Sequence, residues 1–159
     1  MKISLPSNAV NFLNSLIPIC PDGTEIWIMG SRANGRERPD SDTDFLVFST
    51  INILDLVKTK LDKPQKIDCL IIYDGNNYRD PWQKKSGSLS GLKWQPIDDR
   101  SARYIGTKWI PDNQASSLLN ADFGDLIELD ERAYKIWPEP NEKRPLKTNL
   151  RRSTKDGLK

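Results

Sequence analysis

Apolar residues follow two different spacings in the first half of the chain. Short, β-rich apolar runs at residues 25–29, 45–48 and 66–73 predict buried strands. Apolar residues that recur every three or four positions over residues 7–17 and 51–61 predict helices with one apolar face. We therefore expect both helices and strands in this half of the chain.

The second half has a weaker pattern. Residues 75–114 mix glycine, serine, lysine and aspartate with aromatic residues, and their spacing favours neither a helix nor a long strand. Residues 115–119 are expected to form a helical turn. Apolar residues at helical spacing predict a helix over residues 125–137, although its first residues are equally typical of a strand.

Several aromatic residues with basic neighbours lie in or near this less regular part: Trp82, Trp94, Tyr104 and Trp109. Such rings could stack on a nucleotide base. Large rings more often complete a small core and cover the edges of a sheet. We expect the second role for these residues.

The stretch from residue 26 to residue 48 carries the clearest chemical pattern. Gly30 and Ser31 directly follow a predicted strand. A glycine there lets the backbone turn tightly, and a serine offers a hydroxyl and an amide to an anion. Asp42 and Asp44 lead into the next strand, where alternation points both side chains the same way. Two such carboxylates repel each other unless a cation lies between them, and hard oxygen ligands beside a phosphate suit Mg²⁺.

A single acid, Asp68, interrupts the apolar run at residues 66–73. A carboxylate in a buried strand is costly unless a cation or hydrogen bonds satisfy it. The chain contains no histidine, which excludes an imidazole base, a histidine-containing zinc site and a Ser-His-Asp triad. Acid–base chemistry would therefore fall to carboxylates or to water.

The Gly30-Ser31 pair, a spacer and the Asp42-x-Asp44 pair before an apolar strand resemble the signature of the DNA polymerase β-like nucleotidyltransferases. The sequence GSRANGR followed by SDTDFLV is most similar to the minimal nucleotidyltransferase (MNT) branch. The similar core covers residues 24–74. The resemblance implies an α+β fold of the polymerase β type, in which a small mixed sheet is flanked by helices.

The resemblance also implies roles for individual residues. Gly30, Ser31 and Arg32 would bind the nucleotide. The acids that would hold two Mg²⁺ ions, or Mn²⁺ in their place, and carry out catalysis are Asp42, Asp44 and Asp68. The implied reaction moves a nucleoside monophosphate, with ATP as the expected donor of AMP, onto a hydroxyl group and releases pyrophosphate.

MNT proteins often act as antitoxins beside HEPN ribonuclease toxins, some by transferring AMP onto the toxin, so the resemblance implies a HEPN-type partner. The sequence leaves the acceptor open between a protein hydroxyl, an RNA end and a small-molecule hydroxyl. Two alternatives come from other functional classes. One is a regulatory, partner-binding protein that keeps the fold without turnover, and the other is a nucleic-acid-binding protein that uses the basic C-terminal residues.

Length and composition set the remaining bounds. The 159 residues suit one domain, which we place at residues 1–140, followed by a basic, proline-interrupted tail at residues 141–159 that we expect to be mobile. The formal net charge of +2 does not by itself indicate nucleic-acid binding. The sequence has neither an apolar run long enough to span a bilayer nor a signal-peptide pattern, so we expect a cytoplasmic protein without a membrane partner.

Overall fold

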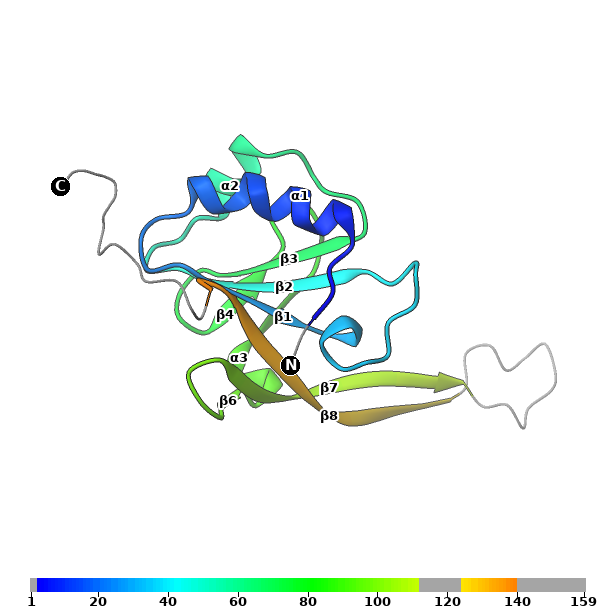
Figure 1. Cartoon of the computed structure of the whole chain (residues 1–159). Coiled ribbons are helices and arrows are strands. Elements are labelled where there is room, and N and C mark those ends of the chain that lie inside the picture. The colour runs from blue at the N-terminus through cyan, green and yellow to red at the C-terminus, as the bar shows by residue number, and fades with distance from the viewer. Residues whose placement is uncertain (1–2, 112–123, 140–159) are drawn as a thin grey trace.

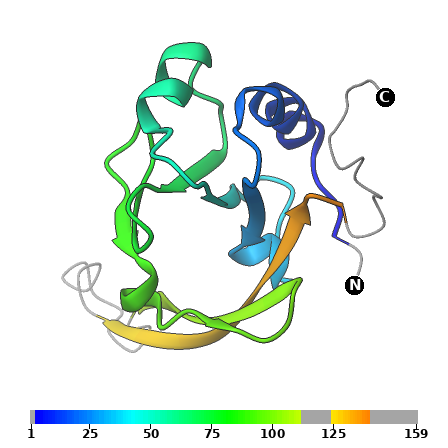
Figure 2. The ribbon, with the colours of Figure 1, turned by 90° about the vertical axis from the view of Figure 1, so that its left-hand side faces the viewer.

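The computed structural model of the chain describes residues 3–111 and 124–139, and they form one curled sheet with a few short helices (Figures 1 and 2). The helices are α1 (Ser7–Leu16), α2 (Leu54–Lys60) and α3 (Leu89–Leu92), with 3-10 turns η1 (Ile17–Ile19) and η2 (Ser31–Ala33). The strands of the first half are β1 (Glu25–Met29), β2 (Thr43–Phe48), β3 (Ile67–Ile72) and β4 (Asn77–Arg79). The later strands are β5 (Ser86–Ser88), β6 (Gln95–Pro96), β7 (Ser101–Pro111) and β8 (Gly124–Trp137).

The sheet has the strand order β5-β4-β3-β2-β1-β8-β7-β6. Strands β2 and β3 run parallel, joined through α2, and the other pairs are antiparallel. In this register Met29 at the end of β1 lies opposite Asp44 in β2, and Asp44 lies beside Asp68 in β3. The C-terminal end of β1 and the N-terminal ends of β2 and β3 therefore lie next to one another, at the same end of these central strands.

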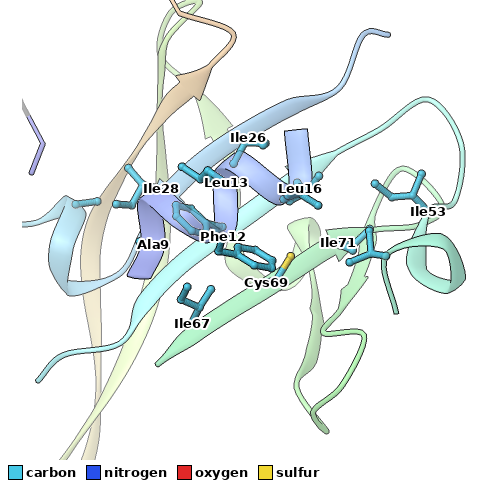
Figure 3. Close-up of a cluster of buried hydrophobic side chains, with 14 residues drawn as sticks. Ala9, Phe12, Leu13, Leu16, Ile26, Ile28, Ile53, Ile67, Cys69 and Ile71 are labelled. Atoms are coloured by element: carbon cyan, nitrogen blue, oxygen red, sulfur yellow. The ribbon is translucent and has the colours of Figure 1, made fainter. Parts of the chain in front are cut away.

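Side chains of the central strands alternate between two apolar clusters, one on each face of the sheet. The first cluster packs α1 against the sheet (Figure 3). Within it, Phe12 stacks on Phe45 at 6.4 Å between ring centroids. Its other members include Ile26, Ile28 and Cys69, which are fully or almost fully buried. This packing fixes the positions of β1, β2 and β3, which carry the candidate site.

The second cluster lies on the opposite face and is rich in aromatic rings. Trp94 contacts Trp27, Phe48 and Tyr104 at centroid distances of 5.3, 5.6 and 6.3 Å. On the first face, Trp82 packs edge-on against Phe12 at 6.3 Å. The expected core role is thus confirmed for Trp82, Trp94 and Tyr104, whereas the side chain of Trp109 is not among those described.

The α+β class and the mixed sheet are confirmed, and the elements expected at residues 7–17, 25–29, 45–48, 51–61 and 66–73 are all present. The helix expected over residues 51–61 is shorter than predicted, because α2 begins only at Leu54, whose amide donates to Asn52 Oδ1 at 2.9 Å. The polymerase β-type arrangement of the elements stays a prediction. Within the described residues no helix is both long and apolar enough to cross a membrane.

The helix predicted over residues 125–137 was wrong, because this segment is the long strand β8. It pairs along its length with β7, which the sequence did not predict, and inserts between β7 and β1. Its helical spacing of apolar residues does not correspond to one buried face, since Leu126 is 66% exposed while Ala133 is fully buried. Pairing with β7 and β1 overrides the local pattern. The turn expected at residues 115–119 and the tail at 141–159 lie outside the described residues.

Candidate functional site

Two carboxylates form the centre of the candidate site. Asp44 and Asp68 are register partners on neighbouring parallel strands, so both side chains project from the same face of the sheet. Burial, followed by the hydrogen bond with Asp68, raises the pKa of Asp44 from its ordinary 3.8 to about 7. Below about pH 7 the pair therefore tends to retain one proton between its two carboxylates when no metal ion is bound.

Asp68 has cationic and amide partners that Asp44 lacks. Lys85 Nζ lies 2.6 Å from Asp68 Oδ2, and Gln83 Nε2 donates to Asp68 Oδ1 at 3.1 Å. Burial alone would raise the pKa of Asp68, but the hydrogen bonds from Lys85, Asp44 and Gln83 outweigh it and lower that pKa. The hydrogen bond with Asp68 likewise raises the pKa of Lys85. Asp68 is thus held as the charged member of the pair.

Gly30 brings the backbone against this pair. Its φ of 74° and ψ of −157° are strained for any residue with a side chain. A Cβ added at Gly30 would collide with Oδ2 of Asp44. Only glycine lets the turn after β1 lie this close to the carboxylate.

The amide of Gly30 is already engaged within the protein. It donates to Tyr104 Oη on β7 at 2.8 Å, and the Gly30 carbonyl accepts from Asn34 Nδ2 at 2.8 Å. The Ser31 carbonyl accepts from the amides of Asn34 and Arg36 at 3.1 and 3.0 Å. The donors that the turn could offer an anion are therefore the amide and hydroxyl of Ser31 rather than the amide of Gly30.

Arg32 stabilises the connection between β1 and β2. Its NH2 group donates to the carbonyls of Ser41 at 2.9 Å and Arg38 at 3.4 Å. Ser41 directly precedes Asp42. In this arrangement the guanidinium positions the segment that leads into the acids. Binding of a nucleotide phosphate by Arg32 stays a prediction.

Residues of the long hairpin formed by β7 and β8 contact the Gly30 turn and the residues that follow it. Arg36 forms a bidentate ion pair with the buried Glu131 on β8, with both N–O distances at 2.7 Å. Asn34 exchanges hydrogen bonds with the backbone of Arg132, which donates to Oδ1 at 2.8 Å and accepts from Nδ2 at 3.0 Å. Such fork-shaped, charge-assisted contacts fix geometry well. They hold the turn in its place beside the acids.

Removing one of these contacts tests the support that the hairpin gives. We expect Tyr104→Phe to lower the free energy of unfolding by about 1–2 kcal/mol, because it leaves the partly buried amide of Gly30 without an acceptor. Urea unfolding would measure this, with Tyr78→Phe as a control for loss of a tyrosine hydroxyl elsewhere. Equal stability of the Tyr104→Phe variant and the parent protein would show that the amide finds another partner.

Asp42 lies near enough to the Asp44–Asp68 pair for its charge to help raise the pKa of Asp44. Asp42 is exposed and directly precedes β2, which begins at Thr43. The alignment of its side chain with that of Asp44 stays a prediction. Two hollows, of about 460 and 450 Å³, meet at Asp68. Asp42 lines the first and Asp44 lines the second.

The two hollows differ in the residues that line them. The hollow beside Asp42 is lined by polar and charged side chains, among them Lys63, Lys66 and Gln83, and by the apolar Pro64 and Ile67. The hollow beside Asp44 has an apolar floor of Met29 and Leu70, with Tyr78, Lys84 and Lys85 around it. The second hollow joins β1 where the Gly30 turn begins, so a nucleotide bound over that turn would lie on this side.

The donor set can be tested against the divalent ions that the resemblance implies. Carboxylate oxygens are the preferred ligands of Mg²⁺ and Mn²⁺, and the paired Asp44 and Asp68 fit one such ion. In the part of the chain that the structure describes, no three acidic or cysteine side chains are close enough together to hold a metal ion. The arrangement therefore fits one ion directly, and a second ion held by Asp42 stays a prediction.

Comparison with known protein families decides the identity of the domain. A family model described as a nucleotidyltransferase domain matches residues 7–156, which is nearly the whole chain. The chain belongs to the nucleotidyltransferase domain family. Comparison with curated proteins and with solved structures found no match. Family membership agrees with the resemblance drawn from the Gly30-Ser31 and Asp42-x-Asp44 motifs, and transfer of a nucleoside monophosphate is the general activity of such a domain.

Sequence reasoning missed several residues that organise this nucleotidyltransferase site: Asp80, Gln83, Lys85, Tyr104 and Glu131. Each reaches the site from a segment in which neither spacing nor motif indicated a role. One signal was available, since a carboxylate in a buried strand needs partners and Asp68 implied donors from elsewhere in the chain. That argument does not say which lysine or glutamine supplies them.

Proposed function

We propose that this nucleotidyltransferase domain transfers AMP from ATP onto a hydroxyl group and releases pyrophosphate, with a divalent cation bound by its acids. The proposal rests on one observation: Asp44 and Asp68 are neighbours on the central strands β2 and β3, and the Gly30-Ser31 turn lies directly beside Asp44. Clustered carboxylates beside a phosphate-binding turn are what phosphoryl chemistry on a polyphosphate requires.

The donor nucleotide is proposed to lie in the hollow beside Asp44. The Ser31 amide and hydroxyl would contact its phosphates, and Lys84 and Lys85 supply positive charge in the same hollow. Tyr78 and the apolar floor suit a base or a sugar. Asp44 and Asp68 would hold Mg²⁺, which supplies charge neutralisation at the phosphates when it is bound.

The acceptor is proposed to approach from the hollow beside Asp42, because Asp68 borders both hollows. The acceptor oxygen forms a bond with the α-phosphorus while the bond to the β-bridging oxygen breaks. Pyrophosphate leaves with that electron pair, and the hydroxyl proton passes to Asp68 or to water. The absence of histidine from the sequence is consistent with a carboxylate in this role.

The resemblance to MNT proteins suggests a hydroxyl of a HEPN-type toxin as the acceptor. The chain would then be an antitoxin. A HEPN reading frame adjacent to the gene would support this assignment. Co-expression followed by mass spectrometry of the toxin would test it, because AMP transfer adds one AMP to a hydroxyl-bearing side chain. An unmodified toxin that still binds tightly would favour the regulatory, partner-binding alternative.

The transfer itself is tested with ATP labelled at either the α- or the γ-phosphate. Toxin, RNA and small hydroxyl compounds would be offered in turn as acceptors. We expect an acceptor to become labelled by the α-labelled ATP and not by the γ-labelled ATP. Transfer of γ-label would mean that the domain acts as a kinase. Absence of all transfer, with nucleic-acid binding that weakens steeply with salt, would favour the nucleic-acid-binding alternative.

Two substitutions separate the donor and acceptor roles. Asp68→Asn should lower kcat by roughly 100-fold or more and raise KM for ATP by a much smaller factor, because Asp68 serves the attacking hydroxyl in addition to the cation, of which Asp44 remains a ligand. Ser31→Ala should raise KM for ATP, since it removes a phosphate donor. Steady-state kinetics with a fixed acceptor would measure both. An equal loss of ATP binding in the two variants would show that Asp68 belongs only to the donor side.

A further inference from the structure

The segment that contacts Asp68 is a short loop, residues 80–85, between β4 and β5, which we call the 80–85 loop. Its first residue, Asp80, is 2% exposed. Asp80 accepts hydrogen bonds from the amides of Cys69, Trp82 and Gln83 at 3.0, 2.9 and 3.0 Å. Its own amide donates to the Lys85 carbonyl at 2.9 Å. The loop is therefore closed on itself and fastened to β3 at the residue next to Asp68.

From this loop two side chains reach the two oxygens of Asp68. Gln83 Nε2 lies between carboxylates, 2.9 Å from Asp80 Oδ2 and 3.1 Å from Asp68 Oδ1. Lys85 Nζ contacts Asp68 Oδ2 at 2.6 Å. Gln83 is thereby tied to the buried anchor of the loop, whereas Lys85 is a flexible side chain, 50% exposed, that lines the hollow beside Asp44.

The position of Lys85 conflicts with a metal ion at the same oxygen. A divalent ion bound to Asp68 would repel an ammonium held 2.6 Å from Oδ2. Asp68 is buried whereas Lys85 is half exposed, so loss of the ammonium alone would leave a buried carboxylate without a counter-charge. A divalent ion bound to the same carboxylate supplies that charge and allows the exposed ammonium to leave. The four-carbon stem of lysine lets the ammonium move within the hollow while the backbone of the loop stays in place.

We propose that Lys85 is a built-in counter-ion of Asp68, that a divalent cation displaces it, and that the released ammonium then contacts a phosphate of the nucleotide. The second part rests on the proposed function, because it requires the donor to occupy the hollow beside Asp44. Gln83 keeps its contact and preserves the orientation of Asp68 during the exchange. Lys85 thus has opposite effects on the two ligands, since it competes with the cation and attracts the nucleotide.

The first test measures Mn²⁺ binding to the protein alone by calorimetry. Lys85→Gln should tighten Mn²⁺ binding by about 5-fold, which corresponds to about 1 kcal/mol, because no ammonium has to leave Asp68. Lys84→Gln is the matched control, since it removes the neighbouring charge in the same hollow but no contact with Asp68. Mn²⁺ binding that is unchanged or weaker in Lys85→Gln, or equally tightened in both variants, would overturn the proposal.

The second test measures binding of a non-hydrolysable ATP analogue in saturating Mg²⁺. Lys85→Gln should weaken this binding by roughly 5-fold or more, and Lys85→Arg should restore most of it, because arginine also donates to phosphate. If Lys85→Gln changed the affinities for Mn²⁺ and for the nucleotide in the same direction, the proposed exchange would be contradicted. The expected Mn²⁺ result in a protein that shows no transfer would refute the proposed function and leave the counter-ion role intact.

Discussion

Replacing Asp44 with asparagine is expected to abolish nucleotidyl transfer and, at the same time, to stabilise the metal-free protein. Activity should fall by roughly 1000-fold or more, because a neutral amide is a poor ligand for a divalent cation. Asparagine is nearly isosteric with aspartate and can donate to Asp68, so the register of β2 and β3 is kept. A binding defect caused by misfolding would instead lower stability.

The stabilisation has a defined pH window. Burial, then the hydrogen bond with Asp68, raises the pKa of Asp44 to about 7 in the folded chain. A carboxyl that binds its proton more tightly when folded loses stability as the pH rises from its unfolded pKa of about 4 towards the folded value. Above about pH 7 the parent protein carries the full destabilisation from the ionised Asp44, and there Asp44→Asn should raise the free energy of unfolding by about 1–3 kcal/mol.

Thermal unfolding in EDTA across this pH range would measure the effect. The curves of parent and variant should converge towards about pH 4 and separate as the pH rises. Asp62→Asn, which changes an exposed acid, is the control for a general change of net charge. A variant that is less stable than its parent at about pH 8 would contradict the buried, proton-sharing state assigned to Asp44.

Replacing Gly30 with alanine is the other large effect that we expect. The added Cβ would collide with Asp44 Oδ2 while the backbone sits at φ 74°. We expect a loss of about 2–4 kcal/mol in the free energy of unfolding and a loss of at least about 100-fold in activity, because either the turn or the carboxylate must move.

Gly35 offers a matched control within the same connection. Its φ of 73° is almost the same, but a Cβ there would meet nothing within 4 Å. Gly35→Ala should therefore cost only the backbone strain, about 1 kcal/mol, and leave activity near that of the parent. Urea unfolding and transfer assays on both variants would separate strain from the collision. Similar losses in the two variants would mean that close approach of Gly30 to Asp44 is unimportant.

The elements of the first half could be predicted because their signals are local. The runs that became β1, β2 and β3 are apolar and short, and α1 shows its buried face in its own spacing. The grouping of Asp68 with Asp44 was implied by the family resemblance, which assigns both acids to one metal site. Their exact register, which makes them direct neighbours, depends on the parallel pairing that only the structure shows.

The hairpin of β7 and β8 could not be predicted, because each strand depends on the other. Residues 125–137 have apolar spacing that fits a helix, and only pairing with residues 101–111 makes the strand the favoured state. The contact of Tyr104 with the Gly30 amide spans 74 positions in the sequence. Such long-range contacts leave no trace in local patterning.

The 80–85 loop was missed for a different reason. Its sequence, DPWQKK, has the appearance of a solvent-exposed turn. Its role arises from Asp80, which turns inward and caps the amide of Cys69 beside Asp68. A buried aspartate in a turn has no distinctive sequence signal, so the partners of Asp68 emerge only from the three-dimensional arrangement.

Binding of a nucleotide through a divalent cation held by Asp44 and Asp68 is tested most directly by calorimetric titration with a non-hydrolysable ATP analogue. We expect saturable binding in Mg²⁺, loss of at least about 100-fold in affinity when EDTA replaces Mg²⁺, and a similar loss in Asp44→Asn. Asp62→Asn should bind as the parent does. Affinity that is the same with EDTA as with Mg²⁺, or is retained in Asp44→Asn, would contradict this mode of binding.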